Sequence, residues 1–272
     1  MRPKALILLA YGTNRDQDVG EALTLAGADP EIVPLNILRN DRKRWSNYQM
    51  LVLAGGFSYA DALGAGKLLA VDLRAYFADE IRQFVESGKP VIGICNGFQA
   101  LVKAGILPGN QESDNQALGL GTQSPVPDYL STLTFNACGH FECRWVALQP
   151  VSQKCLWTRD LSELIECPIA HGEGNFQVAD RSLLSTLQSL DQIALACVNP
   201  DDSPANGRYP ANPNGSVLDI AGITNPAGNV LGLMPHPENH IHPWQHPQCS
   251  RGVERGSGLV LFENGVKYAE EG

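Results

Sequence analysis

The sequence predicts an α/β fold in which helices cover both faces of a parallel sheet. Two observations lead to this prediction. In the first half of the 272-residue chain, short continuous apolar runs alternate with amphipathic stretches, which is the pattern of strands buried on both faces. The second half holds more apolar runs of strand length, separated by turns rich in proline and glycine. We find no internal repeat and no linker, so we expect one domain over residues 1–272.

The first half begins with the apolar run 5–9, which we assign to a strand because it is too short for the core of a signal peptide. Residues 19–26 have apolar positions at helical spacing, and residues 31–34 and 50–54 are the next two strands. The first strands are therefore joined by helical stretches, as a parallel sheet requires.

Residues 68–87 are amphipathic over a length that fits two consecutive helices. The fourth apolar strand, 91–94, leads directly into a helix predicted at 97–104. A residue between such a strand and helix lies above the carboxyl edge of the sheet, where open α/β folds bind their ligands.

The second half predicts strands at 133–135, 142–148, 193–198, 217–224 and 230–234. Segments 108–131 and 237–257 have weak periodicity, and we expect both to be long surface loops. No apolar run approaches the roughly 20 residues that span a bilayer.

Composition excludes several classes of function. The formal net charge is −9 and the pI is near 5.1, so no broad basic surface is available for nucleic acid or an anionic membrane. The chain has seven cysteines, an odd number, without the spacing of a disulfide framework. Free thiols in a reducing cytoplasm fit this pattern.

The strand at 91–94 ends in Gly-Ile-Cys-Asn-Gly, residues 93–97. This is the nucleophile elbow G-x-Nu-x-G with Cys95 as the nucleophile. The flanking glycines remove side chains that would clash in the sharp strand-to-helix turn, and the helix N-terminus favours a thiolate. The alternative interpretation is a buried structural cysteine between two packing glycines.

A thiolate nucleophile needs a base and a group that orients the base. His236 follows the apolar strand 230–234, and Glu238 lies two residues further on, within reach of the far nitrogen of the ring. Taken alone, this motif is weak, but beside a cysteine elbow it predicts a Cys95–His236–Glu238 triad. An oxyanion hole would come from the backbone amides of Gly56, after the strand 50–54, and of Asn96.

Three other motifs were weighed. The run Gly-Ala-Gly-Lys at 64–67 resembles a phosphate loop but has the wrong glycine spacing and Leu68 in place of Ser or Thr. Two clusters could hold zinc, and neither has paired four-ligand spacing, so we expect no metal. They are Cys138, His140 and Cys143, and the histidines His236, His240, His242 and His246.

The motifs together resemble those of class I, triad-type glutamine amidotransferases, and most closely the glutaminases of phosphoribosylformylglycinamidine synthase. The resemblance covers nearly the whole chain. It rests on Gly-Gly-Phe-Ser-Tyr-Ala-Asp at 55–61, the elbow at 93–99, His-Gly-Glu-Gly at 171–174, Asn-Pro-Asn-Gly-Ser at 212–216 and Met-Pro-His-Pro-Glu at 234–238.

The resemblance implies a three-layer, flavodoxin-like domain that hydrolyses glutamine through a cysteine thioester. It implies that Gln99, Gly172 and Phe176 contact the amino-acid end of the substrate. It also implies a synthetase partner, with a small accessory subunit, that uses ATP and Mg²⁺ while this chain needs no cofactor of its own.

Alternatives stay open at this point. The chain could serve another amidotransferase, act alone as a hydrolase, or be a non-enzymatic thiol sensor of the same elbow fold. The sensor interpretation leaves His236 and Glu238 unexplained. If His236 were not the base, His171 would be the next histidine to test.

Overall fold

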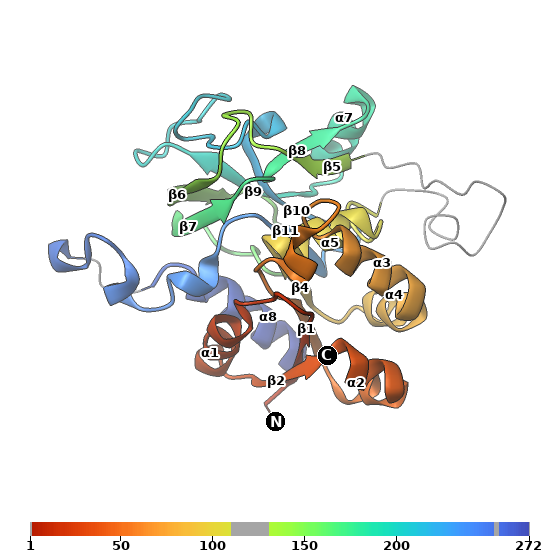
Figure 1. Cartoon of the computed structure of the whole chain (residues 1–272). Coiled ribbons are helices and arrows are strands. Elements are labelled where there is room, and N and C mark those ends of the chain that lie inside the picture. The colour runs from red at the N-terminus through yellow and green to blue at the C-terminus, as the bar shows by residue number, and fades with distance from the viewer. Residues whose placement is uncertain (1, 110–130, 253–255, 272) are drawn as a thin grey trace.

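The computed structural model describes residues 2–109, 131–252 and 256–271. Its centre is a nine-stranded sheet with the order β2-β1-β3-β4-β11-β10-β9-β6-β7. A second sheet of two strands pairs β5 (Ser131–Thr134) with β8 (Asn175–Val178). Figure 1 shows the large sheet running through the molecule, with the small sheet and α7 (Arg181–Ser189) at one end.

The first five strands of the sheet order are parallel. They are β2 (Asp29–Pro34), β1 (Lys4–Leu9), β3 (Met50–Leu53), β4 (Val91–Ile94) and β11 (Val230–Leu233). Every residue of β3, β4 and β11 is buried. The continuous apolar runs of the sequence thus form strands covered on both faces, as predicted.

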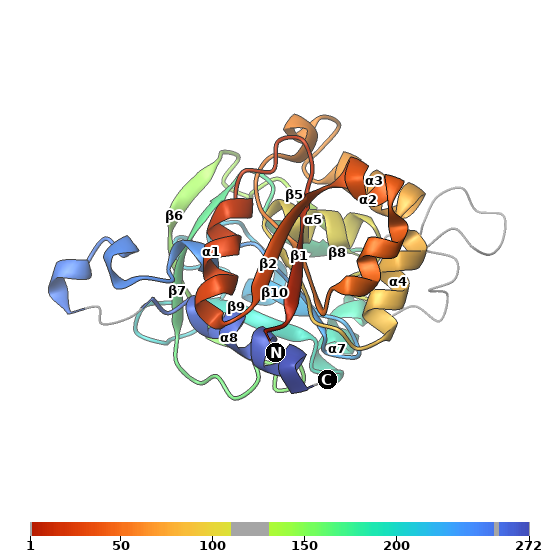
Figure 2. The same ribbon diagram turned by 90° about the horizontal axis from the view of Figure 1, so that it is seen from below.

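Helices form the outer layers. On one face, α1 (Asp16–Ala26) packs against α8 (Leu259–Glu271). On the other, α5 (Asn96–Lys103) contacts β4 and β11 and packs against α3 (Lys67–Tyr76). The predicted helical stretch 68–87 is two helices, α3 and α4 (Ala78–Glu86), with Phe77 between them. The view from below in Figure 2 shows α1 on one side of β1 and α2 (Leu35–Asn40), α3 and α4 on the other.

The other strands pair in antiparallel fashion. They are β10 (Ile220–Thr224), β9 (Ile193–Val198), β6 (Glu142–Pro150) and β7 (Ile165–His171). The chain therefore has the predicted α/β layers, with an antiparallel extension on the parallel sheet.

Several elements differ from the prediction. The strand expected at 217–224 begins at Ile220, because residues 217–219 form a 3₁₀ turn with Leu218 at φ 51°. The sequence analysis did not predict β7, β8, α2, α7 or α8. In β7 the buried residues alternate, but Pro168 stands inside the run, and proline weakens a strand signal.

The surface-loop prediction for 237–257 is wrong for its first part. Residues 237–251 hold three short 3₁₀ turns, and His240 and Ile241 are buried there. Most of the other predicted loop, 108–131, lies outside the described residues. Among the described helices, none is long and apolar enough to cross a membrane.

Candidate active site

Cys95 lies in the sharp turn between β4 and α5, at φ 49° and ψ −105°. Few non-glycine residues adopt a positive φ, so the surrounding structure must hold this strained conformation. The turn also needs Gly97, since a Cβ atom there would lie 2.0 Å from the carbonyl oxygen of Leu53 in β3. The strand, the turn and the helix together form the predicted elbow.

His236 reaches Cys95 because their strands are neighbours. Leu233 of β11 pairs with Ile94 of β4, and the amide of Cys95 donates a hydrogen bond to the Leu233 carbonyl, 2.8 Å away. The chain then continues past the sheet edge, and the His236 ring comes close enough to Cys95 for the cysteine to raise the pKa of the ring. The nucleophile and its predicted base are thus in contact.

Glu238 occupies the other side of the ring. Its Oε1 atom lies 2.7 Å from Nδ1 of His236, and its side chain is completely buried. An Nδ1–H that donates to the carboxylate leaves Nε2 facing the cysteine sulfur. Cys95, His236 and Glu238 therefore lie side by side in the order that the sequence predicts, with a hydrogen bond between His236 and Glu238.

The charges around His236 favour its protonated form. Burial opposes the charged form, but the negative charges of Glu238 and Cys95 and their hydrogen bonds outweigh that effect and raise the pKa of His236. A raised pKa at the base is what a thiolate–imidazolium pair requires.

The two predicted oxyanion donors lie at this same edge of the sheet. Asn96 is the first residue of α5, so its N–H has no acceptor within the helix. The N–H of Gly56 makes no hydrogen bond within the described parts of the chain. Gly56 has φ 135°, and a Cβ atom there would lie 2.6 Å from the amide nitrogen of Asn14. Only glycine fits this position.

Gly55 brings the same turn against the predicted base, His236. A Cβ atom at Gly55 would lie 2.8 Å from Cε1 of His236. The Gly55 carbonyl accepts hydrogen bonds from the amides of Asn14 and Arg15, which fixes the turn. The two glycines thus allow His236 to approach the turn closely, and they leave the amide of Gly56 available.

A protein-family model matches almost the whole chain. Residues 2–269 match the family model of the CobB/CobQ-like glutamine amidotransferase domain.

The chain belongs to this family of glutamine amidotransferases.

Among curated relatives, the phosphoribosylformylglycinamidine synthase subunit PurQ of Treponema denticola is 55% identical, over 98% of this chain and 99% of its own. That of Dehalococcoides mccartyi is 41% identical, over 98% of both chains. The solved structure of PurLQS from Thermotoga maritima has a TM-score of 0.69 and 31% identity, covering 98% of this chain and 99% of its own. A glutamine amidotransferase from Thermotoga maritima, at a TM-score of 0.56 and 14% identity, supports the fold alone.

In this amidotransferase, the side chain of Asn96 holds the turn that follows β3 against α5. Its Oδ1 accepts hydrogen bonds from the amide of Ser58, at 3.1 Å, and from the Ser58 hydroxyl. Its Nδ2 donates to Asp61 at 2.8 Å and to Gln99 at 3.1 Å. Both ends of the amide are used, so the backbone of Asn96 cannot shift without breaking several bonds.

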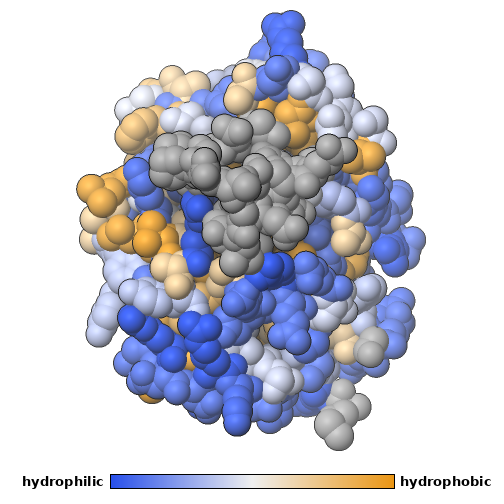
Figure 3. Space-filling view, turned by 90° about the vertical axis from the view of Figure 1, so that its right-hand side faces the viewer, coloured by the Kyte–Doolittle hydropathy of each residue, from blue (hydrophilic) through white to orange (hydrophobic). Residues whose placement is uncertain are grey.

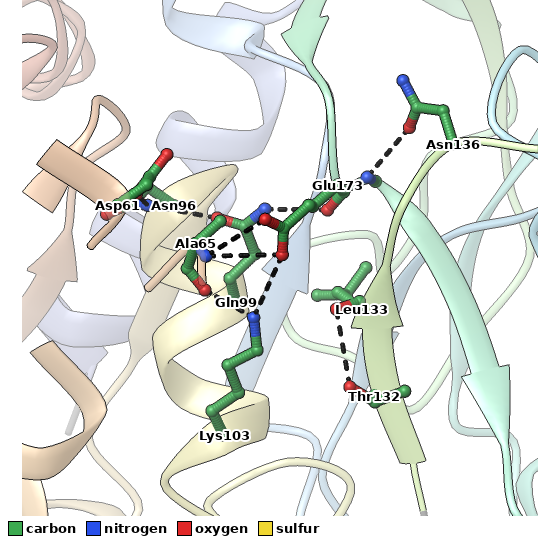
Figure 4. A network of polar contacts seen from close by, with 10 residues as sticks. Asp61, Ala65, Asn96, Gln99, Lys103, Thr132, Leu133, Asn136 and Glu173 are labelled. Atoms are coloured by element: carbon green, nitrogen blue, oxygen red, sulfur yellow. Dashed lines mark hydrogen bonds and ion pairs between the residues drawn. The ribbon is translucent and has the colours of Figure 1, made fainter. Parts of the chain in front are cut away.

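Gln99, predicted to bind substrate, is tied to the loop between β7 and β8 (Figure 4). Its Nε2 donates to the carbonyl of Glu173 at 2.7 Å. The Glu173 carboxylate in turn accepts from the amide of Ala65 and lies 3.6 Å from the ammonium of Lys103. Gln99 therefore positions the loop through its side chain. The sequence analysis missed Glu173, whose partners lie far away in the chain.

Of the other two predicted substrate residues, Gly172 lies in the same loop and Phe176 lies in β8. The carbonyl of Gly172 accepts a hydrogen bond from the amide of Asn136, 2.9 Å away. Phe176 is 1% exposed, and its ring stacks on Phe98 of α5 with the centroids 6.4 Å apart. This placement favours packing against the nucleophile helix over contact of the ring with a substrate.

His171, the alternative base, does not take the place of His236. Its Nδ1 lies 3.1 Å from Oδ1 of Asn136, and its Nε2 has no hydrogen-bond partner in the described parts of the chain. Burial, with the positive charge of His236, lowers the pKa of His171 to about 4. The ring is therefore neutral near pH 7.

The residues of the run 64–67 make contacts with other parts of the protein. Gly66 precedes the first residue of α3 and packs against α5, and the amide of Ala65 is bound by the Glu173 carboxylate. His242 contacts Glu21, and His240 packs against the ring of Trp145.

Proposed function

We propose that this chain is the glutaminase subunit of phosphoribosylformylglycinamidine synthase. It would hydrolyse glutamine and deliver ammonia to a synthetase subunit, which converts formylglycinamide ribonucleotide to formylglycinamidine ribonucleotide in purine biosynthesis. The observation that carries the proposal is the buried line Cys95–His236–Glu238 in a chain 55% identical, over nearly its whole length, to a PurQ subunit.

In the first step, the Cys95 thiolate attacks the carbon of the glutamine side-chain amide. A C–S bond forms, and the carbonyl electrons move onto oxygen. The amides of Gly56 and Asn96 would hold that oxyanion, because neither has another acceptor among the described residues of the chain.

In the second step, His236 gives its Nε2 proton to the amide nitrogen, the C–N bond breaks, and ammonia leaves. Water then attacks the thioester while His236 takes the proton from it, and glutamate is released as Cys95 returns to its thiolate. Glu238 keeps the ring in one orientation throughout and stabilises its charge.

The partner in this proposal is a synthetase subunit together with a small accessory subunit. A relative of 31% identity has been solved as PurLQS, which supports such an assembly. ATP and Mg²⁺ would be used by the synthetase. On the face that carries α3 and α4, hydrophobic side chains gather in patches (Figure 3), and Leu63, Val71 and Phe135 are among the exposed apolar residues.

We also propose that residues 1–272 work as one domain in the cytoplasm. The family match over residues 2–269 and the sheet shared by both halves of the chain support a single domain. All seven cysteines are free, which suits a reducing compartment.

Cys95→Ala tests the function directly. With the cognate synthetase present, the variant should lose glutamine-dependent synthesis and keep synthesis driven by added ammonium, because only the ammonia source depends on the thiol. The control is Cys249→Ala, which removes an exposed cysteine. Glutamine-dependent synthesis that survives in Cys95→Ala would rule out Cys95 as the nucleophile.

Glutaminase turnover measured with and without the synthetase tests the partner. A subunit of a synthase should be slow alone and faster in the complex. Turnover that is equally fast without the synthetase would indicate an independent hydrolase.

A further inference from the structure

Three side chains outside the triad converge at the start of β6. Cys138, His140 and Glu142 each place one metal-ligating atom within 4.8 Å of the other two. The chain turns sharply here, with Gly139 at φ 75° and its amide donating to the carbonyl of Asn136 at 2.9 Å. In the extended segment that follows, His140 and Glu142 point to one side, and Phe141 stacks on Phe57 instead.

The ring of His140 is already oriented as in a metal ligand. Its Nδ1 lies 3.1 Å from the carbonyl oxygen of Cys138, so Nδ1–H donates there and Nε2 carries the free lone pair. Such a hydrogen bond to a backbone carbonyl commonly sets the tautomer of metal-binding histidines. The Nε2 atom lies 3.0 Å from Oε1 of Glu142.

Glu142 supplies a buried carboxylate to the cluster. Its side chain is 3% exposed, and its Oε2 accepts a hydrogen bond from Nε of Arg144 at 2.7 Å. Its Oε1 is buried and lies 3.0 Å from Nε2 of His140, so a polar neighbour of this oxygen is another of the three metal-ligating side chains. A cation between these two atoms would be held by both.

We propose that Cys138, His140 and Glu142 bind one divalent transition-metal ion of the zinc class. A thiolate, an imidazole and a carboxylate are the donors that Zn²⁺ takes, and tetrahedral coordination would separate these atoms by about 3.3–3.6 Å. The present separations of up to 4.8 Å need only small side-chain movements. Because the side chain of His140 is 63% exposed, water can reach the fourth position.

A metal ion here would stabilise the loop beside the triad. Asn136 links the two segments, since its Nδ2 donates to the carbonyls of His140 and His171 at 3.0 and 2.8 Å. Its Oδ1 accepts from the amide of Gly174 at 3.0 Å. The site is separate from the glutaminase chemistry, and the proposal does not depend on that function.

Cobalt binding to the full-length, metal-free chain tests the site. A Cys138 thiolate bound to Co²⁺ should add a ligand-to-metal absorption band in the near ultraviolet that saturates at one ion per chain, and Zn²⁺ should displace it. Cys138→Ser should abolish the band. His140→Ala should weaken Co²⁺ binding at least tenfold, roughly the smallest loss seen even for groups outside the ligand set.

Two controls separate the site from other thiols and histidines. Cys143→Ser removes an exposed cysteine on the next strand, and His242→Ala removes a histidine that contacts Glu21. Both should retain the band. Zn²⁺ should also raise the Tm of the parent chain but not of folded His140→Ala, because a ligand stabilises only the state that binds it. No band in the parent chain, or an unchanged band in Cys138→Ser and His140→Ala, would overturn the proposal.

Discussion

The end of β7 and the segment after β11 each hold a buried histidine, yet the two histidines are in opposite electrostatic states. His236 and His171 are both 3% exposed. His236 faces the carboxylate of Glu238 and has a raised pKa, whereas His171 faces the amide of Asn136 and its pKa falls to about 4. Burial lowers the pKa of both rings, so the charge of the neighbouring side chain decides which ring is protonated near pH 7.

The largest expected effect comes from removing the charged histidine. His236→Ala should lower glutaminase kcat by about 10⁴-fold, the upper end for general acid–base catalysis, because the thiolate–imidazolium pair is lost as well. The measurement is kcat in the complex at matched concentrations of folded protein. His171→Asn is the matched control and should stay within about tenfold of the parent, since the imidazole beside Cys95 remains. Equal losses in the two variants would contradict the comparison.

Glu238→Gln should make His236 resemble His171. Without the carboxylate, burial is no longer outweighed to the same degree, so the pKa of His236 should fall, as measured by NMR titration of its ring. We expect kcat to fall by about 10²-fold, less than for His236→Ala, because the ring can still transfer protons. An unchanged titration of His236 would show that Glu238 is not the source of the raised pKa.

The smallest expected effect is on stability. A neutral His171 with a folded-state pKa near 4 contributes stability that is present above its unfolded pKa of about 6.5 and is lost as the pH falls toward 4. Between pH 7 and pH 5, this group should lower the free energy of unfolding by about 2 kcal/mol. Urea unfolding should show that His171→Asn loses less stability than the parent over this range. A parallel decline in both proteins would refute the neutral assignment.

The pH dependence of stability has the opposite sign for His236. Its raised folded-state pKa means that its contribution to stability is present below the unfolded value and is lost as the pH rises through the folded one. Low pH should therefore remove the stability that His171 contributes at the end of β7. High pH should remove the stability that His236 contributes after β11.

The parallel half was largely predictable because its signals are local. The strand at 91–94 and the elbow at Cys95 were predicted from a few consecutive residues, and the structure confirms the strand. The β7–β8 region was less predictable. Pro168 interrupts the alternation of β7, and Glu173 is defined by its contacts with Lys103 and Ala65, about 70 and 108 residues earlier in the chain, which no local pattern encodes.

The sequence by itself determined the α/β class and the strand–turn–helix at Cys95, and it predicted the three triad residues, because each depends on backbone preferences and residue chemistry within a short stretch. Only the tertiary structure decided that β11 lies beside β4 and so brings His236 to Cys95. It also decided that Gln99 and Phe176 are used for internal contacts. The tertiary structure also decided the protonation of the two histidines, because burial and neighbouring charge exist only once distant segments have packed together.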